Sequence, residues 1–580
     1  EVNTMKRLLI YISLQLLLVC RIRADCVVSI DQGTARGALL TSFAGKEFCS
    51  YSGIPYATPP VGDLRFRAPE PALPWTGELN ATKPGNSCMQ SLMSIYLGNE
   101  DCLYLNVHTP QVTESTSELL PVMVFIHGGG YTFGSGKPAS YGPHFIIDKD
   151  VVMITINYRL GVFGFLSTGD DAAPGNFGLK DQLEALRWIQ KNIAAFGGDP
   201  NKVTIFGESA GSFSVHFHVL SQASKGLFHA AIGESGSALM PMFLDTTHSS
   251  AVALKQGEAV GCPTDNTADL IDCLRKIDAD TLMTNDPGMY YEEWRVVTET
   301  QSDLNPEPFL TAPPQDIIRS GNFNKVPFVL GTNSEEAGFF LVPYIGTKDV
   351  MDKLNLNFDR LGETAFFLWE SESQDMIAAT WQSVADFYIG TNHTITPDNY
   401  HKLIEAANDR FMQHNIQKSV ELHLQAGHST VYLYNFGYRG KYSLIAKARY
   451  GDLRFDLEQT YVLGVLHADE MQYILSYGSD PQKWTAGHPD LEVVDAVVTL
   501  WTNVAKYGHP TPSEGTIPQS IVWPAAGDNE DQVTYYVFGH QEPPVEPVDG
   551  IMPLRISVVP DLFKARMDFW DSLPLSENQQ

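Results

Sequence analysis

The chain has 580 residues, 43% of them hydrophobic and 11% aromatic, so it can bury a large core. Its formal net charge of −29 at pH 7 repels phosphate backbones, which excludes nucleic acid from the expected partners. Because no repeat, low-complexity stretch or Ser/Gly-rich linker divides the sequence, we expect one domain over residues 25–580.

Residues 1–24 are expected to be a leader and a signal peptide rather than part of the fold. A basic pair follows Met5, an apolar stretch extends from Leu8 to Val19, and the small residue Ala24 suits a cleavage site. The apolar stretch is shorter than the ~20 residues that a membrane-spanning helix needs, so we expect no transmembrane span. This pattern predicts a secreted, extracellular protein.

Cysteine usage agrees with an oxidising compartment. Cys20 leaves with the predicted signal peptide, and an even number of cysteines remains. Two pairs enclose short loops and a third spans a predicted N-terminal hairpin, so the candidate disulfides are Cys88–Cys102, Cys262–Cys273 and Cys26–Cys49. Asn80 and Asn392 begin glycosylation sequons. No His/Cys cluster has the spacing of metal ligands, so we expect no metal.

Buried strands and an amphipathic helix alternate in the middle of the chain. Leu120–Ile126 is a continuous apolar run, typical of a strand buried on both faces, and a run of glycines follows at 128–130. Val151–Ile156 is a second such strand, and Leu179–Phe196 carries leucine and isoleucine on one helical stripe. A short strand, Val203–Phe206, comes next. The alternation predicts an α/β fold with a large, mostly parallel central sheet flanked by helices.

The strand Val203–Phe206 leads directly into the motif GESAG at 207–211. Small residues at both ends of this motif let a strand turn sharply into a helix, which exposes the serine hydroxyl above the sheet. Such motifs also arise by chance, and residues 233–237 nearly repeat it without the closing glycine. Context favours Ser209, because it and the glycines at 128–130 follow strands whose carboxyl ends are expected to meet at one edge of the sheet.

A serine nucleophile also needs a base to take its proton and donors that stabilise the oxyanion. The backbone N–H groups of Gly129, Gly130 and Ala210 are the natural donors for this oxyanion hole, because glycine lets the main chain approach without a Cβ. A phosphate-binding interpretation of these glycines is excluded, since no Gly-x-x-x-x-Gly-Lys-Ser/Thr motif is present.

Several motifs occur together in one order: EDCLYLNV at 100–107, HGGG at 127–130, NYRLGVFGFLS at 157–167, GNFGLKDQ at 175–182 and FGGDPNKVTIFGESAG at 196–211. With them, the chain resembles the type-B carboxylesterase/cholinesterase family of α/β-hydrolases over nearly all of the mature sequence, and the secreted insect carboxylesterases in particular. The resemblance implies an α/β-hydrolase fold with long insertions, hydrolysis of small-molecule esters through an acyl-enzyme, no cofactor, and a monomer or homodimer.

The resemblance also implies a catalytic triad in the order serine, acid, histidine. The family's acid lies five residues after a glycine that follows a strand, here Val326–Leu330, and this spacing selects Glu336 over its neighbour Glu335. The family's histidine lies in a Gly-x-x-His-x-x-Glu pattern, here 464–470, which selects His467.

These residues have distinct expected roles. His467 takes the Ser209 proton, donates it to the leaving alcohol and later activates water, while Glu336 orients the imidazole and stabilises its cation. Glu208, beside the nucleophile, is interpreted as a structural hydrogen-bonding residue.

Departures from the family narrow the expected substrate. In the cholinesterase branch of the family, a tryptophan in the loop closed by the first disulfide binds choline by cation–π attraction. The corresponding loop here, between Cys88 and Cys102, has no tryptophan, so choline esters are poor candidates. Juvenile hormone esterases usually have glutamine before the serine, so Glu208 counts against that branch. An ungapped alignment puts Met242 where many relatives carry an acyl-pocket tryptophan, which predicts a roomier pocket unless a loop shift leaves Met242 in ordinary packing.

The leading hypothesis is a secreted carboxylesterase of broad, largely apolar specificity that acts on xenobiotic or dietary esters. Organophosphates are expected to modify Ser209. Because the loop 128–130 has no acid or histidine to help water attack the phosphylated serine, the phosphyl group is expected to leave slowly, so that the protein sequesters the organophosphate. A close alternative is an esterase dedicated to one hormone, pheromone or odorant ester. A third is a non-catalytic binding protein, which the intact positions 209, 336 and 467 disfavour.

Overall fold

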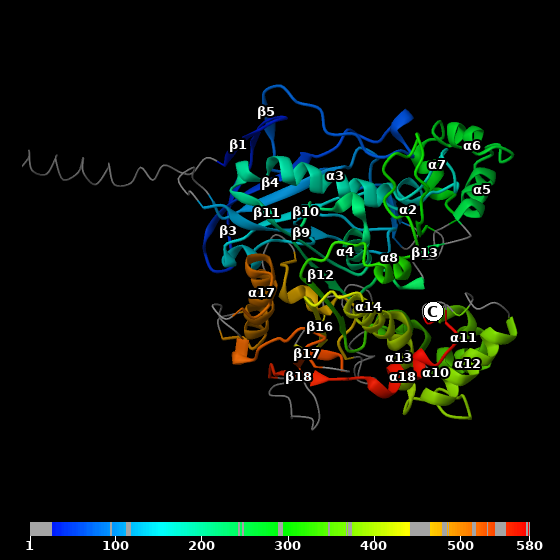
Figure 1. The fold of residues 1–580 in the computed structure, drawn as a ribbon. Coiled ribbons are helices and arrows are strands. Elements are labelled where there is room, and N and C mark those ends of the chain that lie inside the picture. Colours follow the sequence, from blue (N-terminus) through cyan, green and yellow to red (C-terminus); the bar gives the residue numbers. More distant parts are fainter. Residues whose placement is uncertain are drawn as a thin grey trace, which may run out of the picture.

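The computed structural model describes residues 26–92, 95–111, 118–241, 244–245, 249–287, 294–345, 348–366, 368, 374–440, 443, 464–477, 484, 487–512, 518–529, 532–539, 553–575 and 578. The expected signal peptide over residues 1–24 and the acyl-pocket candidate Met242 lie outside these residues. Figure 1 shows a central twisted sheet with helices on both faces. Among the described helices, none is long and apolar enough to cross a membrane.

The largest sheet in the described residues has eleven strands in the order β18-β17-β16-β15-β12-β11-β9-β10-β8-β4-β3. The strands from β17 to β10 in this order pair in parallel, whereas β18 at one edge and β8, β4 and β3 at the other pair antiparallel. Their bounds are β3 Ala38–Thr41, β4 Glu47–Pro55, β8 Tyr104–Thr109, β9 Leu120–Ile126, β10 Val152–Ile156, β11 Gly198–Glu208, β12 Ala230–Glu234, β15 Phe328–Asn333, β16 Val431–Gly437, β17 Thr534–Gly539 and β18 Ile556–Pro560. The predicted α/β fold with a mostly parallel central sheet is confirmed.

The sheet separates two hydrophobic cores, and the alternation of side chains along β9 shows how. Val122, Val124 and Ile126 pack into one core, while Met123 and Phe125 pack into the other. Successive side chains of a strand point to opposite faces, so a strand covered on both sides reads as an unbroken apolar run.

Helices close each core. Helix α3 (Phe177–Asn192) places its leucines in the first core, and α17 (Asp490–Tyr507) places its valines and Trp501 in the second. Figure 1 shows α3 above the sheet and α17 below it. The remaining described α-helices are α2 Gly161–Phe165, α4 Ala210–Leu220, α5 Ser249–Ala259, α6 Thr267–Leu274, α7 Ala279–Thr284, α8 Pro314–Ser320, α9 Gly338–Ile345, α10 Lys348–Leu356, α11 Phe358–Ala365, α12 Gln374–Tyr388, α13 Tyr400–Asn408, α14 His414–Gln425 and α18 Lys564–Asp571.

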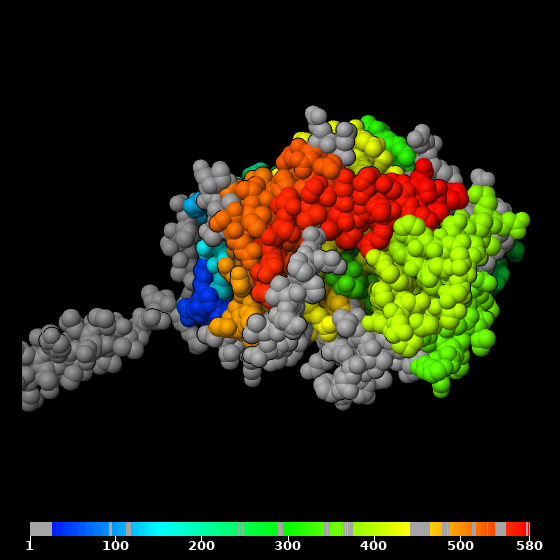
Figure 2. Space-filling model, turned by 90° about the horizontal axis from the view of Figure 1, so that it is seen from below, coloured from blue at the N-terminus to red at the C-terminus, as the bar shows by residue number. Residues whose placement is uncertain are grey.

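Small sheets and insertions surround this framework. The short strands are β1 Val27–Ile30, β2 Gly33–Arg36, β5 Glu78–Asn80, β6 Gln90–Leu92, β7 Ile95–Leu97, β13 Leu244–Asp245 and β14 Val296–Val297. Figure 2 shows the C-terminal residues, in red, lying between the orange region of α17 and the yellow-green helices α10–α13. Trp570 of α18 anchors them there, because its indole N–H donates a 2.7 Å hydrogen bond to the Tyr388 hydroxyl.

The predicted elements differ from the observed ones mainly at their ends. The strand predicted over 120–126 has those bounds, and the one predicted over 151–156 begins one residue later. The helix predicted over 179–196 begins at Phe177 and stops at Asn192, where the chain tightens into a 3₁₀ turn, as often happens at a helix end. The strand predicted over 203–206 is part of the longer β11, and the one predicted over 326–330 is shifted to 328–333.

The structure contains three disulfide bonds within the described residues, Cys26–Cys49, Cys88–Cys102 and Cys262–Cys273. The first joins β4 to the N-terminal residue of the described chain, and the third connects α6 to the loop that precedes it. The sequon residues Asn80 and Asn392 are both exposed.

Three buried histidines form an ordered chain of hydrogen bonds. The Ala238 N–H donates to His216 Nδ1 at 3.0 Å, so the proton of this neutral ring lies on Nε2 and reaches His423 Nε2 at 3.0 Å. The His423 proton therefore lies on Nδ1 and reaches His428 Nδ1 at 3.2 Å, and His428 Nε2–H donates to the Val326 carbonyl at 2.7 Å. Each ring donates once and accepts once, so an added proton would place two N–H groups face to face.

Acid should therefore destabilise the fold through these rings. Burial lowers the pKa of His216 to about 3, that of His428 to about 4 and that of His423 well below the usual value. Because the unfolded rings bind protons near pH 6.5 and the folded rings do not, stability is lost as pH falls below about 6.5, by ~1.4 kcal/mol per pH unit for each ring.

We predict that the variant His216→Leu/His423→Leu loses less of its thermal midpoint between pH 6.5 and pH 4.5 than the unsubstituted protein. Differential scanning fluorimetry across this range measures the effect. His401→Gln is the matched control, because His401 is exposed. An equal slope in all three proteins would show that the buried rings do not control acid stability.

Candidate active site

Ser209 lies at the junction of β11 and α4 in a strained backbone conformation, with φ 58° and ψ −123°. The turn requires the glycines on either side of it. A Cβ on Gly207 would lie 2.5 Å from the Ile126 carbonyl oxygen, and a Cβ on Gly211 would lie 2.0 Å from the same atom. The strand-to-helix turn expected from the motif is therefore present, and its steric reason is the close approach of β9.

A second turn of the same kind lies beside it, at the end of β12. Gly233 and Glu234 are the register partners of Gly207 and Glu208, and Ser235 has φ 59°, close to that of Ser209. The near-repeat in the sequence is thus a structural repeat on the neighbouring strand. Its serine has a different contact, because the Ser235 hydroxyl donates a 2.5 Å hydrogen bond to Glu336 Oε1.

Glu336 and His467 meet directly. His467 Nδ1 lies 2.6 Å from Glu336 Oε2, while Oε1 of the same carboxylate accepts from Ser235 and from the Asn333 N–H at 2.6 Å. Glu335 was the alternative to Glu336 in the sequence. It accepts a 2.8 Å hydrogen bond from the Val465 N–H. The local roles of Ser235 and Asn333 were missed by sequence reasoning, and the repeated Gly-Glu-Ser was the available signal for Ser235.

The other nitrogen of the imidazole faces Glu208. His467 Nε2 lies 3.1 Å from Glu208 Oε1, and both side chains are 8% exposed. Among the described side chains, none forms a hydrogen bond with the Ser209 hydroxyl; such bonds are often long in free enzymes and tighten when substrate binds. Glu208, interpreted from the sequence as a structural hydrogen-bonding residue, has its carboxylate facing the imidazole beside Ser209.

Two buried carboxylates, Glu208 and Glu336, contact this imidazole and control its charge. Burial alone lowers the pKa of His467, but attraction to Glu208 and the hydrogen bond to Glu336 outweigh it and raise that pKa to about 9. Burial and repulsion from Glu336 raise the pKa of Glu208 to about 7, against the attraction of His467. Burial also raises the pKa of Glu234 to about 8, and burial together with Glu336 raises that of Glu470 well above its usual range.

The glycine loop after β9 lies against Ser209. A Cβ on Gly128 would come within 3.0 Å of the Ser209 Cβ, and one on Gly129 would lie 2.1 Å from the Phe133 carbonyl oxygen. Gly129 and Gly130 both have positive φ, at 104° and 59°. In the described part of the chain, the N–H groups of Gly129, Gly130 and Ala210 donate to no protein acceptor, and Ala210 opens α4 at the positive end of its dipole.

This arrangement is suited to acyl transfer. A carboxylate on Nδ1 holds the imidazole in the tautomer whose Nε2 can exchange a proton with a nearby hydroxyl. Three unused backbone donors beside a serine can stabilise a tetrahedral oxyanion, and losing one such donor typically costs about 3–4 kcal/mol. No group of three or more His, Cys, Asp or Glu side chains in the described residues could hold a metal ion.

Comparisons with known proteins agree with this geometry. A family model described as "Carboxylesterase family" matches residues 24–546. The chain is 40% identical over 510 residues to a juvenile hormone esterase of Tribolium castaneum, with 84% of each chain covered. It is 33% identical over 560 residues to a carboxylic ester hydrolase of Bombus ignitus, with 95% of each covered. A juvenile hormone esterase of Manduca sexta, solved with OTFP covalently attached, is 27% identical with a TM-score of 0.78, over 95% of this chain and 99% of that one.

We predict that Glu208→Gln shifts the acid limb of the pH profile of kcat/KM to lower pH. Glutamine keeps the size of the side chain but removes the negative charge that raises the pKa of His467, so the imidazole loses its proton at a lower pH. Initial rates on a nitrophenyl ester between pH 5 and pH 10 measure the shift.

The matched control is Glu184→Gln. Burial raises the pKa of Glu184 to about 7 as well, but this residue lies on α3 and does not act on His467. Its profile should follow that of the unsubstituted protein. If Glu208→Gln leaves the acid limb where it was, Glu208 does not set the charge of the imidazole.

Proposed function

The chain belongs to the carboxylesterase family and is a carboxylic-ester hydrolase, and we propose that it is a secreted serine esterase of broad, largely apolar specificity. Ser209 is the nucleophile, His467 the general base and acid, and Glu336 the carboxylate that orients the imidazole. The observation that carries these roles is the 2.6 Å contact between His467 Nδ1 and Glu336, with Nε2 directed toward the residue next to Ser209.

The reaction follows from these positions in two halves. His467 takes the Ser209 proton as the oxygen attacks the ester carbonyl, and the N–H groups of Gly129, Gly130 and Ala210 stabilise the oxyanion. Collapse breaks the bond to the alcohol, which leaves with the proton from His467, and an acyl-enzyme remains. Water then gives its proton to His467, attacks the acyl group and releases the acid, and the proton returns to Ser209.

Glu208 acts electrostatically in this proposal. Its carboxylate lies beside the imidazole, where it stabilises the imidazolium that forms when Ser209 attacks. The same charge keeps the resting imidazole protonated to higher pH, so activity is expected to favour neutral to alkaline conditions.

Features of the whole chain support secretion. The N-terminal sequence has the pattern of a signal peptide, the three disulfide bonds within the described residues suit an oxidising compartment, and both sequon asparagines are exposed. The proposed substrates are small esters of the diet or the environment, and the proposed assembly is a monomer or homodimer.

Hydrolysis of a juvenile hormone ester is the second candidate function. It is favoured by the 40% identity to the protein of that name from Tribolium castaneum and by the similarity to the Manduca sexta structure. Glu208 counts against it, because that branch usually carries glutamine at this position. The broad esterase therefore remains the leading proposal.

We predict that Ser209→Ala lowers kcat for nitrophenyl esters by at least about 10⁴-fold and leaves the thermal midpoint unchanged. The unsubstituted protein should bind one equivalent of an organophosphate at Ser209, seen by mass spectrometry, and should recover activity slowly. Comparable turnover by the purified alanine variant would exclude Ser209 as the nucleophile. Rapid spontaneous recovery would exclude sequestration.

Kinetic measurements on a panel of esters separate the two candidate functions. For the broad esterase, kcat/KM should vary gradually among naphthyl, nitrophenyl and aliphatic esters, with juvenile hormone no better than the rest. A single ester exceeding the others by about 10³-fold would identify a dedicated role, because specificity is a ratio of kcat/KM values.

A further inference from the structure

A cavity of about 560 Å³ lies between α3, α6 and the loops at 66–69 and 304–307, apart from the site described above. None of Ser209, His467 and Glu336 lines it. Its volume falls within the ~300–1,000 Å³ of typical small-molecule sites. It therefore has the size of a binding site that the ester hydrolysis does not use.

Much of the lining is apolar. Phe66, Phe177 and Ile271 are buried in its wall, so they offer a ligand little surface, whereas Ala68, Leu304 and Pro306 are exposed. Leu304 is 77% exposed, although it belongs to the same lining. An apolar side chain so exposed offers surface that a bound hydrocarbon group would cover favourably.

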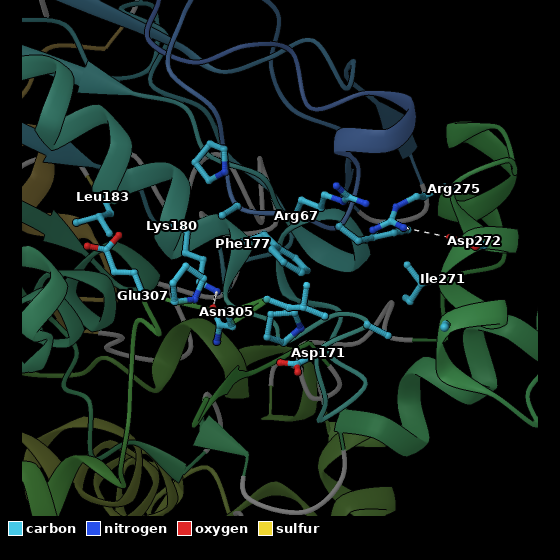
Figure 3. Close-up of a pocket in the computed structure, with 18 of the residues that line it drawn as sticks. Arg67, Asp171, Phe177, Lys180, Leu183, Ile271, Asp272, Arg275, Asn305 and Glu307 are labelled. Atoms are coloured by element: carbon cyan, nitrogen blue, oxygen red, sulfur yellow. Dashed lines mark hydrogen bonds and ion pairs between the residues drawn. The ribbon is translucent and has the colours of Figure 1, made fainter. Parts of the chain in front are cut away.

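One end of the cavity is positively charged. Figure 3 shows the guanidinium groups of Arg67 and Arg275 near each other at this end. Leu183 marks the opposite end, and Phe177 lies between the two ends. Arg67 is exposed, and in the described part of the chain its guanidinium has no hydrogen bond or ion pair. It is the group that lacks a counter-charge.

Arg275 is only weakly compensated. Its Nε donates to the Arg65 carbonyl at 3.0 Å, and its Nη1 lies 3.3 Å from Asp272, whose carboxylate is 68% exposed and therefore strongly solvated. Burial and the repulsion of Arg67 lower the pKa of Arg275. Asp63 also attracts Arg275, but in the described residues only Asp272 is in ion-pair contact with either guanidinium, which leaves room for one further negative charge.

The two other cations of the lining are paired within the protein, in the contacts Lys180–Glu299 and Arg187–Glu307 at 2.5 Å each. The carboxylate of Asp171 accepts a 2.6 Å hydrogen bond from Ser302, which leaves its charge in place. Among the cations of the lining, the positive charge with no carboxylate in contact is therefore that of Arg67, within the described residues.

We infer that this cavity binds an amphipathic carboxylic acid, with its carboxylate on Arg67 and Arg275 and its hydrocarbon chain against the exposed Leu304 and Pro306. Arginine pairs with carboxylates through two parallel N–H donors, which suits a guanidinium that has no other partner. A single negative charge matches the one guanidinium that is not compensated. Because binding does not involve Ser209, this site is independent of the proposed function.

The test is a fluorescence titration of the full chain with dansyl-labelled undecanoic acid. The Ser209→Ala variant serves as the background, so that the methyl ester of the probe is not hydrolysed. We expect Arg67→Gln to raise the Kd of the acid by about tenfold, since it removes a charged hydrogen-bonding pair. The methyl ester of the probe lacks the charge that Arg67 would bind. Its Kd for the Ser209→Ala protein should therefore be at least as high as the Kd of the acid for the protein that also carries Arg67→Gln.

Two further variants sharpen the result. Arg187→Gln is the matched control, because Arg187 lines the same cavity but already pairs with Glu307, and it should change the Kd by less than twofold. Leu304→Asp should also weaken binding, since it replaces apolar contact at an exposed position with a negative charge.

Three results would overturn the proposal. Unchanged binding by Arg67→Gln would place the probe elsewhere, including the catalytic site. If Arg67→Gln and Arg187→Gln raised the Kd of the acid equally, the effect would come from long-range electrostatic attraction and not from a contact with Arg67. Equal affinity for the acid and its methyl ester would exclude recognition of the carboxylate. None of these outcomes depends on whether Ser209 hydrolyses esters.

Discussion

The contact that the candidate site depends on is between the β11–α4 turn and the carbonyl oxygen of Ile126 at the end of β9. Both Gly207 and Gly211 approach this atom so closely that neither position has room for a Cβ. The turn that holds Ser209 in its strained conformation therefore packs directly against β9, and the glycine loop follows β9 in the chain. One steric constraint thus places the serine beside the N–H groups of that loop, which have no protein acceptor within the described residues.

The charge arrangement of the site follows from burial around this framework. Glu208 and Glu336 are both buried and contact opposite nitrogens of one imidazole, and burying a carboxylate costs free energy unless a cation or donors contact it. Glu336 is compensated by Ser235 and by the Asn333 N–H as well as by His467, so it has the most complete set of partners. This difference explains why Glu336 holds the imidazole while Glu208 modulates its charge.

Much of the framework could be predicted, because the patterns that determine it are local. The strand Leu120–Ile126 is buried on both faces and therefore apolar throughout, and its predicted ends agree with the structure. The strand predicted over 326–330 was misplaced, because β15 continues through the polar residues Thr332 and Asn333, which pair with β16. Polar residues inside a buried strand conceal its end, since their hydrogen bonds are made to distant segments.

By itself, the sequence predicted the fold class, the glycine loop and the turn at Ser209, because the patterns that indicate them each lie within a short stretch of the chain. The family resemblance singled out His467 and Glu336, although nothing local distinguishes them from other histidines and glutamates. Tertiary structure alone decided that the Ser235 hydroxyl supports Glu336, that Glu208 faces the imidazole, and that Arg67 and Arg275 meet at one cavity. The physical reason is that these contacts join segments up to some 260 residues apart in the chain, and only packing brings such segments together.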